Sequence, residues 1–218
     1  MKNVLITAGA TVIRIDQVRA ITNIFKGKTG TAIAHYFADM GINTTLVTSN
    51  PSIAKEHTLL KVIRYSTYGD LAEVLEREIK SGLYDVVIHS AAVSDYQVAG
   101  VYFKDEKGTL VPLDVDTKIS SAYPNLYLEL APTKKLIDLI RDPWGFNGSL
   151  IKFKLEVGKS KDELLEIASR SVNFSKADLI VANCLEWFGQ TALLVKPDGC
   201  YEEVNREELA KKLYRRVI

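Results

Sequence analysis

Short apolar runs alternate with amphipathic segments along the first half of the chain. Residues 3–7 form an apolar run closed by a turn at Gly9, which is typical of a buried parallel strand that delivers its carboxyl end to a turn. The segment 28–40 carries apolar residues at helical spacing and a glycine suited to a C-cap, as shown by Ile33, Tyr36, Phe37, Met40 and Gly41. The same criteria predict strands at 44–48 and 85–93 and a helix at 70–80. This β-α-β-α-β order predicts a Rossmann-like half.

The second half continues the alternation after one irregular stretch. From 94 to 124 charges, glycines and prolines mix with short apolar islands, and we expect this segment to be an active-site lid, the alternative being a β-excursion. Beyond it, the pattern predicts strands at 126–130, 150–156 and 177–182, helices at 132–141 and 161–174, and a hairpin at 191–204. Asn205 and Glu208 are spaced as a capping box for a final helix. The predicted fold is therefore α/β, a Rossmann-like parallel sheet with helices on both faces, a C-terminal β-hairpin and a lid, in a single domain over 1–218.

Composition narrows the class of partner. The chain has 218 residues, of which 47% are hydrophobic and 25% charged, enough material for a substantial core. Lysine and arginine number 28 against 27 acidic residues, so no strong overall field attracts nucleic acid or a membrane surface. No apolar run approaches a membrane span, and the first residues lack the pattern of a signal peptide. We therefore expect a cytoplasmic protein with a small-molecule partner.

Potential metal ligands are scattered. Cys184 and Cys200 show neither a disulfide framework nor ligand spacing, and His35, His57 and His89 form no local cluster. A metal held by protein side chains alone is not expected.

Two nucleotide-binding motifs can be tested against the sequence. The stretch "ITNIFKGKTG" contains Gly27-Lys28-Thr29, but a P-loop needs a glycine five positions ahead, where this chain has Thr22. A dinucleotide fingerprint needs three glycines in the first turn and an acidic residue near the end of the second strand. This chain has only Gly9 in that turn and no acidic residue at that strand end. Reductases of the short-chain type also need Tyr-x-x-x-Lys, whereas Tyr96, for example, is followed four positions later by glycine. The sequence argues against a P-loop and disfavours an NAD(P)-dependent reductase.

Anion binding at a helix N-terminus needs neither motif. Free N–H groups and the helix dipole attract phosphate and carboxylate, and Lys26, Gly27 and Lys28 stand at the start of the predicted helix. Arg19 and Asn23 lie just ahead of it. An asparagine before a helix is also a common cap, and a lysine such as Lys118 is by default solvated, so only their combination indicates a site.

That combination, in order along the chain, resembles the phosphopantothenoylcysteine synthetase family. The opening "VLITAGATVIRIDQVRAITNIFKGKTG" is similar to the family's first strand, turn and helix start, and it is followed by "HSAAVSDY", "KISS", "KFKLEV" and "ADLIVAN" in the family's order. The motifs span about residues 3–185. The resemblance points to the stand-alone bacterial form of the ligase, without a fused decarboxylase.

The resemblance implies an activity. Such enzymes join the carboxylate of 4′-phosphopantothenate to the amine of cysteine in coenzyme A biosynthesis, through an acyl-nucleotidyl anhydride formed at the α-phosphate of a nucleoside triphosphate. By match to the family, Asn23 is expected to bind the carboxylate and to stabilise the anhydride, and Arg19 to organise the same turn. Lys118 is expected to lie on the lid and to neutralise the phosphates of the nucleotide. Gly9 and Ala92 are expected on the substrate side. The reaction depends on positioning and charge stabilisation, which suits a chain without a nucleophilic triad.

The resemblance also implies how the nucleotide is held. Residues expected to contact it, besides Lys118, are Ala91, Asp95, Pro132, Thr133, Lys134, Lys135 and Phe153. Core packing is a nearly equal alternative for Phe153, and Pro132 is expected to begin a helix. Bacterial members favour CTP, ATP being the less expected substrate, with Mg²⁺ carried by the triphosphate. Family members are homodimers in which the late hairpin and the lid help to pair subunits.

This sequence departs from the family at several positions. Ala10 stands where a second glycine is usual, and Cys184 where aspartate is usual, either as a passive small residue or as a substrate-side contact. Phe25 is a lid contact or helix-start packing. The family's lysines on the helix before "ADLIVAN" are not matched in place, with Arg170 or Lys176 as candidates to substitute and surface solvation as the alternative. These departures keep open a catalytically inactive nucleotide sensor on the same fold.

Overall fold

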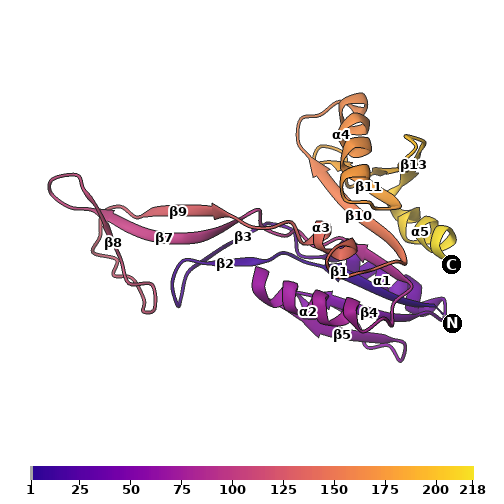
Figure 1. The fold of residues 1–218 in the computed structure, drawn as a ribbon, viewed down its shortest axis with the longest axis horizontal. Helices are drawn as coiled ribbons and strands as arrows, with labels where there is room; N and C mark the ends of the chain where they lie inside the picture. The colour runs from indigo at the N-terminus through magenta and orange to yellow at the C-terminus, as the bar shows by residue number, and fades with distance from the viewer. Residues whose placement is uncertain (1) are drawn as a thin grey trace.

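The apolar runs become the strands of one eight-stranded sheet in the computed structural model, which describes residues 2–218 (Figure 1). Its strand order is β13-β12-β11-β10-β6-β1-β4-β5, parallel from β5 through β11 and antiparallel at β12 and β13. The strands are β1 (Asn3–Ala8), β4 (Asn43–Thr48), β5 (Leu60–Arg64), β6 (Val86–His89), β10 (Ser149–Glu156), β11 (Leu179–Cys184), β12 (Thr191–Val195) and β13 (Tyr201–Asn205). The predicted parallel sheet and C-terminal hairpin are confirmed.

Helices cover both faces of this sheet, as predicted. On one face lie α1 and α5, and on the other α2, α3 and α4 (Figure 1). Their bounds are α1 (Lys28–Asp39), α2 (Tyr68–Lys80), α3 (Leu136–Arg141), α4 (Lys161–Phe174) and α5 (Leu209–Val217), with single 3₁₀ turns at η1 (Pro51–Ile53) and η2 (Arg206–Glu208). Because side chains alternate along each strand, the buried strands contribute to two cores at once.

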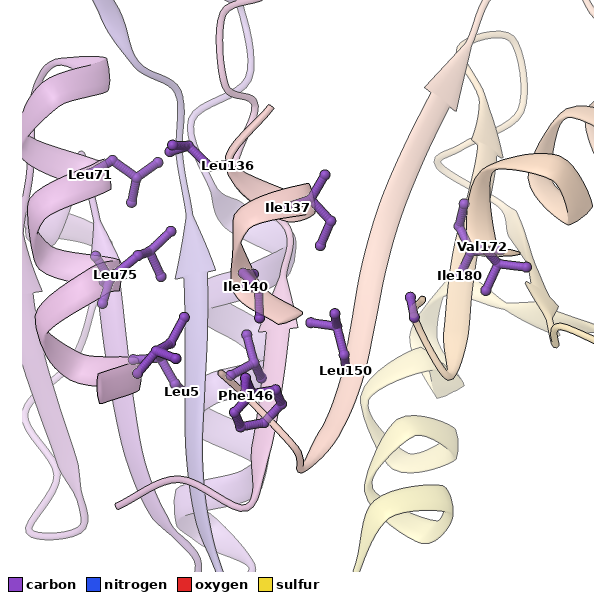
Figure 2. Packing of buried hydrophobic residues seen from close by; sticks show 14 of the residues in the cluster. Leu5, Leu71, Leu75, Leu136, Ile137, Ile140, Phe146, Leu150, Val172 and Ile180 are labelled. Carbon is purple, nitrogen blue, oxygen red and sulfur yellow. The ribbon is translucent and has the colours of Figure 1, made fainter. Parts of the chain in front are cut away.

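The core under α2, α3 and α4 shows how the two halves of the sheet are joined. Leu71 and Leu75 of α2 pack toward Leu5 of β1, while Ile140 of α3 lies over Leu150 of β10 (Figure 2). All of these side chains are fully buried. Burying a leucine or isoleucine contributes about 1.5–3 kcal/mol each, so this continuous cluster fixes the first and second halves relative to each other.

A second sheet of three antiparallel strands projects from the body as an arm (Figure 1). We call it the β-arm; it comprises β7 (Tyr96–Lys104), β8 (Leu110–Pro112) and β9 (Tyr127–Pro132). A short hairpin of β2 (Val12–Arg14) and β3 (Ala20–Thr22) runs along it, with β2 in contact with β7. The segment at 94–124, which we expected to be irregular, therefore contains β7 and β8 as a β-excursion, and its role as an active-site lid stays a prediction.

Three further expectations need correction, and two elements were missed. The third strand ends at His89 rather than 93, because 90–93 form the turn after it. Pro132 ends β9, where it pairs with Tyr96, instead of beginning α3. The capping box at Asn205 does not form: this residue ends β13, and within residues 2–218 no side-chain cap bonds either η2 or α5. Both β5 and the hairpin β2–β3 went unpredicted.

Candidate active site

The turns that follow β1 and β6 meet at the point where the sheet changes direction. From β1 the chain proceeds to β4 and β5 on one side, and it returns through β6 to β10 and β11 on the other. Ligands of open α/β sheets bind at such switch points, beyond the carboxyl ends of the strands. The two turns are hydrogen-bonded to each other, from Ala92 N to Gly9 O at 2.8 Å and from Thr11 N to Ala92 O at 3.2 Å. The sheet therefore forms a fixed floor for a site.

The first helix begins directly on the β1 turn because its cap is a glycine. Gly27 has φ +81°, and a Cβ there would lie 2.5 Å from Gly9 N, so no larger residue fits. The first helical bond of α1 runs from Thr31 N to Gly27 O at 3.0 Å. No side chain among the described residues caps this end, which leaves the N–H groups of its first turn free. An uncapped helix N-terminus at a strand edge attracts anions.

A cavity of about 660 Å³ opens between these elements. Its size is that of a typical ligand pocket. Seven basic side chains line it against one acidic side chain among the residues described, namely Lys26, Lys28, Lys134, Lys135, Lys152, Lys154 and Arg206 against Asp95. The protein's overall charge is close to neutral, so this concentration of positive charge is local to the cavity and favours a polyanionic ligand.

Most of the residues expected at the site line this cavity. They are Gly9, Asn23, Ala91, Ala92, Asp95, Thr133, Lys134, Lys135 and Phe153. The Asn23 carboxamide donates to Ala92 O at 3.4 Å, which holds it beside the β6 turn. Thr133 bonds the same turn, from Oγ1 to Ser94 O at 2.7 Å, and Lys135 Nζ lies 3.9 Å from Asp95 Oδ1. The exit of the β-arm is thus tied to the turn after β6.

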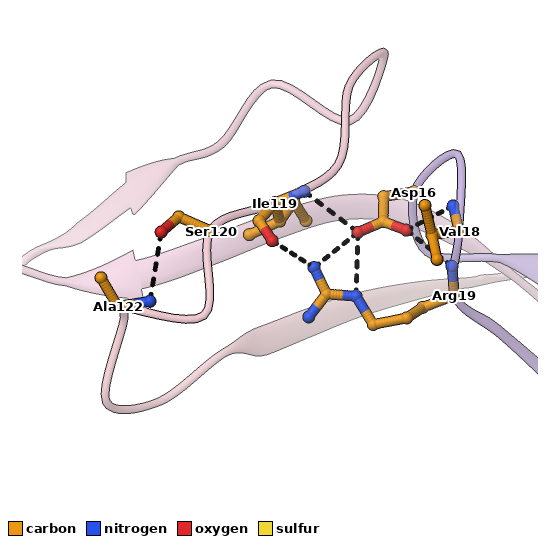
Figure 3. Close-up of polar contacts among 6 residues, drawn as sticks. All are labelled: Asp16, Val18, Arg19, Ile119, Ser120 and Ala122. Carbon is orange, nitrogen blue, oxygen red and sulfur yellow. Dashed lines mark hydrogen bonds and ion pairs between the residues drawn. The ribbon is translucent and has the colours of Figure 1, made fainter.

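Arg19, Lys118 and Pro132 lie outside the cavity lining. Arg19 instead binds Asp16 in its own hairpin turn, with Nη2 2.6 Å from Oδ2, and donates from the same nitrogen to Ile119 O at 2.6 Å (Figure 3). Asp16 Oδ2 also accepts the Ile119 N–H at 3.1 Å. The expectation that Arg19 organises the substrate turn is therefore not met within this chain, because the guanidinium fixes the segment that carries the exposed Lys118.

The Asp16 carboxylate is held in its charged form. Burial by itself would raise its pKa, but hydrogen bonds from the Arg19 side chain and from three backbone N–H groups outweigh burial and keep the pKa well below its usual range. The contact between the β2–β3 hairpin and the Lys118 segment therefore persists throughout the neutral pH range.

The departures from the family pattern fall in three different places. Cys184 is fully buried in the core and its Sγ lies 2.8 Å from Glu186 Oε2, outside the cavity, which agrees with a passive small residue. Ala10 is buried and its N–H donates to Ser49 Oγ at 3.0 Å. Phe25 lines the cavity, edge-on to Phe188 with ring centroids 5.9 Å apart.

Neither Arg170 nor Lys176 lines the cavity. Arg170 Nη2 lies 3.5 Å from Glu166 Oε1 on the exposed side of α4, so it does not substitute for the family's lysines on that helix. A lysine on the neighbouring strand, Lys152, lies against α4 instead, with Nζ 2.9 Å from Ser171 Oγ.

A polar row that the motifs did not reveal crosses three strands below the cavity. In register, Thr7 of β1 lies beside His89 of β6, and His89 lies beside Lys152 of β10. The register pairs place their side chains on one face of the sheet. The sequence offered one signal for this row: Lys152 stands between apolar residues inside one strand, and His89 stands at the end of an otherwise apolar strand. Arg206 of η2 and Asn183 of β11, bonded at 3.0 Å, also line the cavity and carried no local signal.

His89 is neutral in this row. Thr7 Oγ1 accepts the N–H groups of Ser90 and Ala91, each at 3.1 Å, so its own proton is free to donate to His89 Nδ1 at 3.0 Å. His89 Nδ1 is then the acceptor, and the proton of the ring is on Nε2. Burial, with a smaller effect of the Lys152 charge, lowers the pKa of His89 to about 4.

No helix among residues 2–218 is both long and apolar enough to cross a membrane. A doubly wound sheet with a basic cavity at its switch point defines the class, an α/β protein whose cavity is suited to anionic ligands. The chain belongs to the family described as the DNA/pantothenate metabolism flavoprotein C-terminal domain, whose sequence model matches residues 1–218. The predicted family resemblance is confirmed.

Individual relatives agree with this assignment. The DNA/pantothenate metabolism flavoprotein from Streptococcus pneumoniae has a solved structure that is 31% identical, with a TM-score of 0.86, covering 100% of this chain and 98% of that one. The coenzyme A biosynthesis bifunctional protein CoaBC of Thermococcus kodakarensis is 36% identical over 220 residues, which are 98% of this chain and 50% of the relative. The chain thus spans about half the length of the curated relatives it matches. The Cab2 mutant H337A, solved with phosphopantothenate-cysteine, is 18% identical, covers 99% of this chain and 86% of that one, and shares the fold with a TM-score of 0.77.

Proposed function

We propose that this protein is a phosphopantothenate–cysteine ligase of coenzyme A biosynthesis. The cavity carries the proposal: one pocket gathers seven basic side chains, a free helix N-terminus and the Asn23 carboxamide. Membership of the family and the similarity to the bifunctional CoaBC proteins of coenzyme A biosynthesis support it. Two phosphorylated substrates of one reaction would explain why so much positive charge lines a single cavity in a nearly neutral protein.

The proposed reaction has two steps. The carboxylate of 4′-phosphopantothenate attacks the α-phosphate of CTP, an acyl-cytidylate forms and pyrophosphate leaves. The neutral amine of cysteine then attacks the acyl carbon and loses a proton to solvent as the amide forms, and CMP leaves with the pair of electrons of the broken anhydride bond. Both steps join or separate anions, so catalysis consists of positioning and of stabilising negative charge.

Each candidate residue has a proposed role. Asn23, between the β6 turn and the start of α1, holds the substrate carboxylate, with Gly9, Ala91 and Ala92 allowing close backbone approach. The nucleotide lies against Asp95, the 132–135 segment and Phe153. Lys118 reaches the phosphates from a segment outside the cavity lining, and Arg19 positions that segment through Ile119.

Mg²⁺ fits the site as a companion of the triphosphate. Asp95 is the one acidic side chain of the described residues in the lining, and no group of three possible ligand side chains occurs among residues 2–218. A magnesium ion there would be held mainly by phosphate oxygens and water, which is its usual preference in such sites.

We further propose that the protein is a cytoplasmic homodimer that pairs through the β-arm and the β12–β13 hairpin.

The direct test is a mass-spectrometric assay of the purified protein with 4′-phosphopantothenate, cysteine and Mg²⁺, run in parallel with CTP, with ATP and without nucleotide. We expect phosphopantothenoylcysteine with CTP. Product with ATP alone would keep the ligase and overturn the nucleotide, and no product from folded protein would favour a nucleotide sensor.

The Asn23→Asp variant tests the assignment of the catalytic carboxamide. A carboxylate in place of the amide repels the substrate carboxylate and the anhydride phosphate, so turnover should fall by at least about a hundredfold, the range of a lost transition-state donor. Asn23 is exposed, so circular dichroism and the melting temperature should stay at wild-type values. Product formation at the native rate would remove Asn23 from the mechanism.

A further inference from the structure

Lys152 is a lysine in the middle of a buried strand. It is 7% exposed, and it lies on the same face of β10 as Leu150, which belongs to the core under α2, α3 and α4. Its ammonium reaches α4, where Nζ lies 2.9 Å from Ser171 Oγ, 3.3 Å from Ser171 O and 3.1 Å from Ser175 Oγ. Lys152 and Ser171 both line the cavity, so the ammonium is at its wall.

The charge of this ammonium has no counter-ion within ion-pair distance among the described residues. Among residues 2–218 no carboxylate oxygen lies within 4 Å of Lys152 Nζ, whereas the neighbouring Lys154 and Lys135 pair with Glu156 at 2.9 Å and with Asp95 at 3.9 Å. The serine oxygens orient the ammonium but are neutral. Lysine is almost never buried unless it is paired, because an uncompensated charge is costly to remove from water. Something outside the chain would have to balance it.

The surroundings of Lys152 bring the pKa of its side chain close to neutral pH. Burial lowers its pKa to about 8; Asp138 of α3 raises it from beyond ion-pair distance, and Lys135 and Lys154 lower it. His89 faces it from β6 as a neutral ring, and Ile180 is its partner in β11. An anion beside the ammonium would restore the charged form.

We propose that the Lys152 ammonium binds a phosphate oxyanion of the ligand held in this cavity. The inference rests on the proposed function, which supplies phosphate from two sources, the triphosphate and 4′-phosphopantothenate. In this proposal Lys152 of β10 takes the place of the lysines that the family carries on the helix corresponding to α4. Lys152 rather than Arg170 or Lys176 then provides positive charge to that wall of the site.

The experiment measures dissociation constants by calorimetry for CTP, cytidine and 4′-phosphopantothenate. The variants are Lys152→Met, which keeps the length of the side chain without charge, and Lys152→Gln, which keeps a hydrogen-bond donor to the serines. Arg170→Met removes one positive charge from the exposed side of α4 and is the matched control. We expect both Lys152 variants to bind at least one phosphorylated ligand about ten- to a hundredfold more weakly, the value of a charge-assisted hydrogen bond, while cytidine and the control stay at wild-type affinity. The ligand that is weakened identifies the source of the phosphate.

Unchanged affinity of both variants for both phosphorylated ligands would overturn the inference and leave Lys152 a structural residue. That outcome leaves the proposed function intact, because the wild type still binds its substrates. If folded wild-type protein binds neither ligand, the proposed function and the inference fail together.

Proton uptake provides a readout that a structural role would not change. Because burial lowers the pKa of Lys152 to about 8, part of the Lys152 side chains should be uncharged in the free protein at pH 8, and phosphate binding should then take up a fraction of a proton. Calorimetry in two buffers of different ionisation enthalpy measures this uptake, which should disappear in both variants. Equal uptake in wild type and variants would contradict the proposal.

Discussion

The neutral His89 makes a quantitative prediction about acid stability. Its side chain is buried, with 8% of the residue exposed, and its Nδ1 accepts the Thr7 hydroxyl proton. Protonation would break that hydrogen bond and place a second positive charge beside Lys152. Both effects oppose the charged ring in the folded state, whereas the unfolded chain binds the proton freely.

The size of the effect follows from the pKa values. A shift from 6.5 to about 4 means that the unfolded chain binds more protons between these values, so stability falls as the pH falls. The contribution is fully present above pH 6.5 and is lost progressively as the pH drops through about 4. At about 1.4 kcal/mol per pKa unit the loss from His89 alone is about 2 kcal/mol at pH 5 and about 3 kcal/mol below pH 4.

The substitution His89→Asn isolates the contribution of His89 to the pH dependence of the free energy of unfolding. The asparagine oxygen stands near the position of Nδ1 and can accept the Thr7 proton, but the side chain does not titrate. Urea unfolding of both proteins at pH 7.5, 6 and 5 gives the free energy of unfolding, and all shared carboxylates cancel in the difference between wild type and variant.

We expect the variant to lose about 2 kcal/mol less than the wild type between pH 7.5 and pH 5. Any constant cost of the smaller side chain is the same at each pH and drops out. Parallel curves, with less than about 0.5 kcal/mol of divergence, would show that His89 is protonated as easily in the folded state as in the unfolded chain, and would refute the neutral state assigned to the ring.

Two further predictions concern backbone positions around the site. Gly27→Ala should cost about 1–3 kcal/mol more than Gly41→Ala in chemical denaturation, because both glycines have φ near +81° but only Gly27 faces the backbone of Gly9; equal costs would contradict the close contact. Asp16→Asn should speed amide exchange around Ile119 while β1 stays protected, because the charged acceptor of the Ile119 N–H is lost; unchanged exchange there would show that the hairpin does not hold the Lys118 segment.

Local signals in the sequence predicted the elements that depend on local chemistry. The helix expected at 161–174 has these bounds in the structure, since Ser160 and Glu163 form a capping box and Leu164, Ala168 and Val172 turn inward at helical spacing. The strand β1 was likewise visible as an apolar run, because parallel strands covered on both faces must be apolar throughout.

The elements that were missed depend on distant partners. β5 is an edge strand whose exposed residues interrupt any apolar run, and it is defined by pairing with β4. Of the strands of the β-arm, β9 was expected as a strand at 126–130, whereas β7 and β8 are mostly exposed or half-buried, so neither alternation nor an apolar run marks them. Their order comes from pairing between residues about 30 positions apart, such as Gln97 with Ala131, which no local pattern reveals.

The residues of the candidate site likewise fall into those that local motifs predicted and those that only long-range contacts bring together. The family resemblance placed Asn23, Ala92 and Asp95 at the cavity, and each of them lies near the end of a predicted strand or ahead of a predicted helix. His89 and Lys152 become neighbours only through the register of β6 and β10, and Arg19 reaches Ile119 across 100 positions of sequence. Residues whose role depends on register or on long-range contacts could not be assigned from spacing alone.

The distribution of charge around the cavity ties its formation to the complete fold. Lys26 and Lys28 come from the start of α1, Lys134 and Lys135 from the exit of the β-arm, Lys152 and Lys154 from β10, and Arg206 from η2. No single segment assembles this cluster, and like charges that line one cavity oppose each other. The packed cores on both faces of the sheet hold the elements in place against that repulsion. A bound anion would relieve this repulsion, so the proposed affinity of the cavity for phosphorylated ligands depends on the packed sheet that holds these basic side chains together.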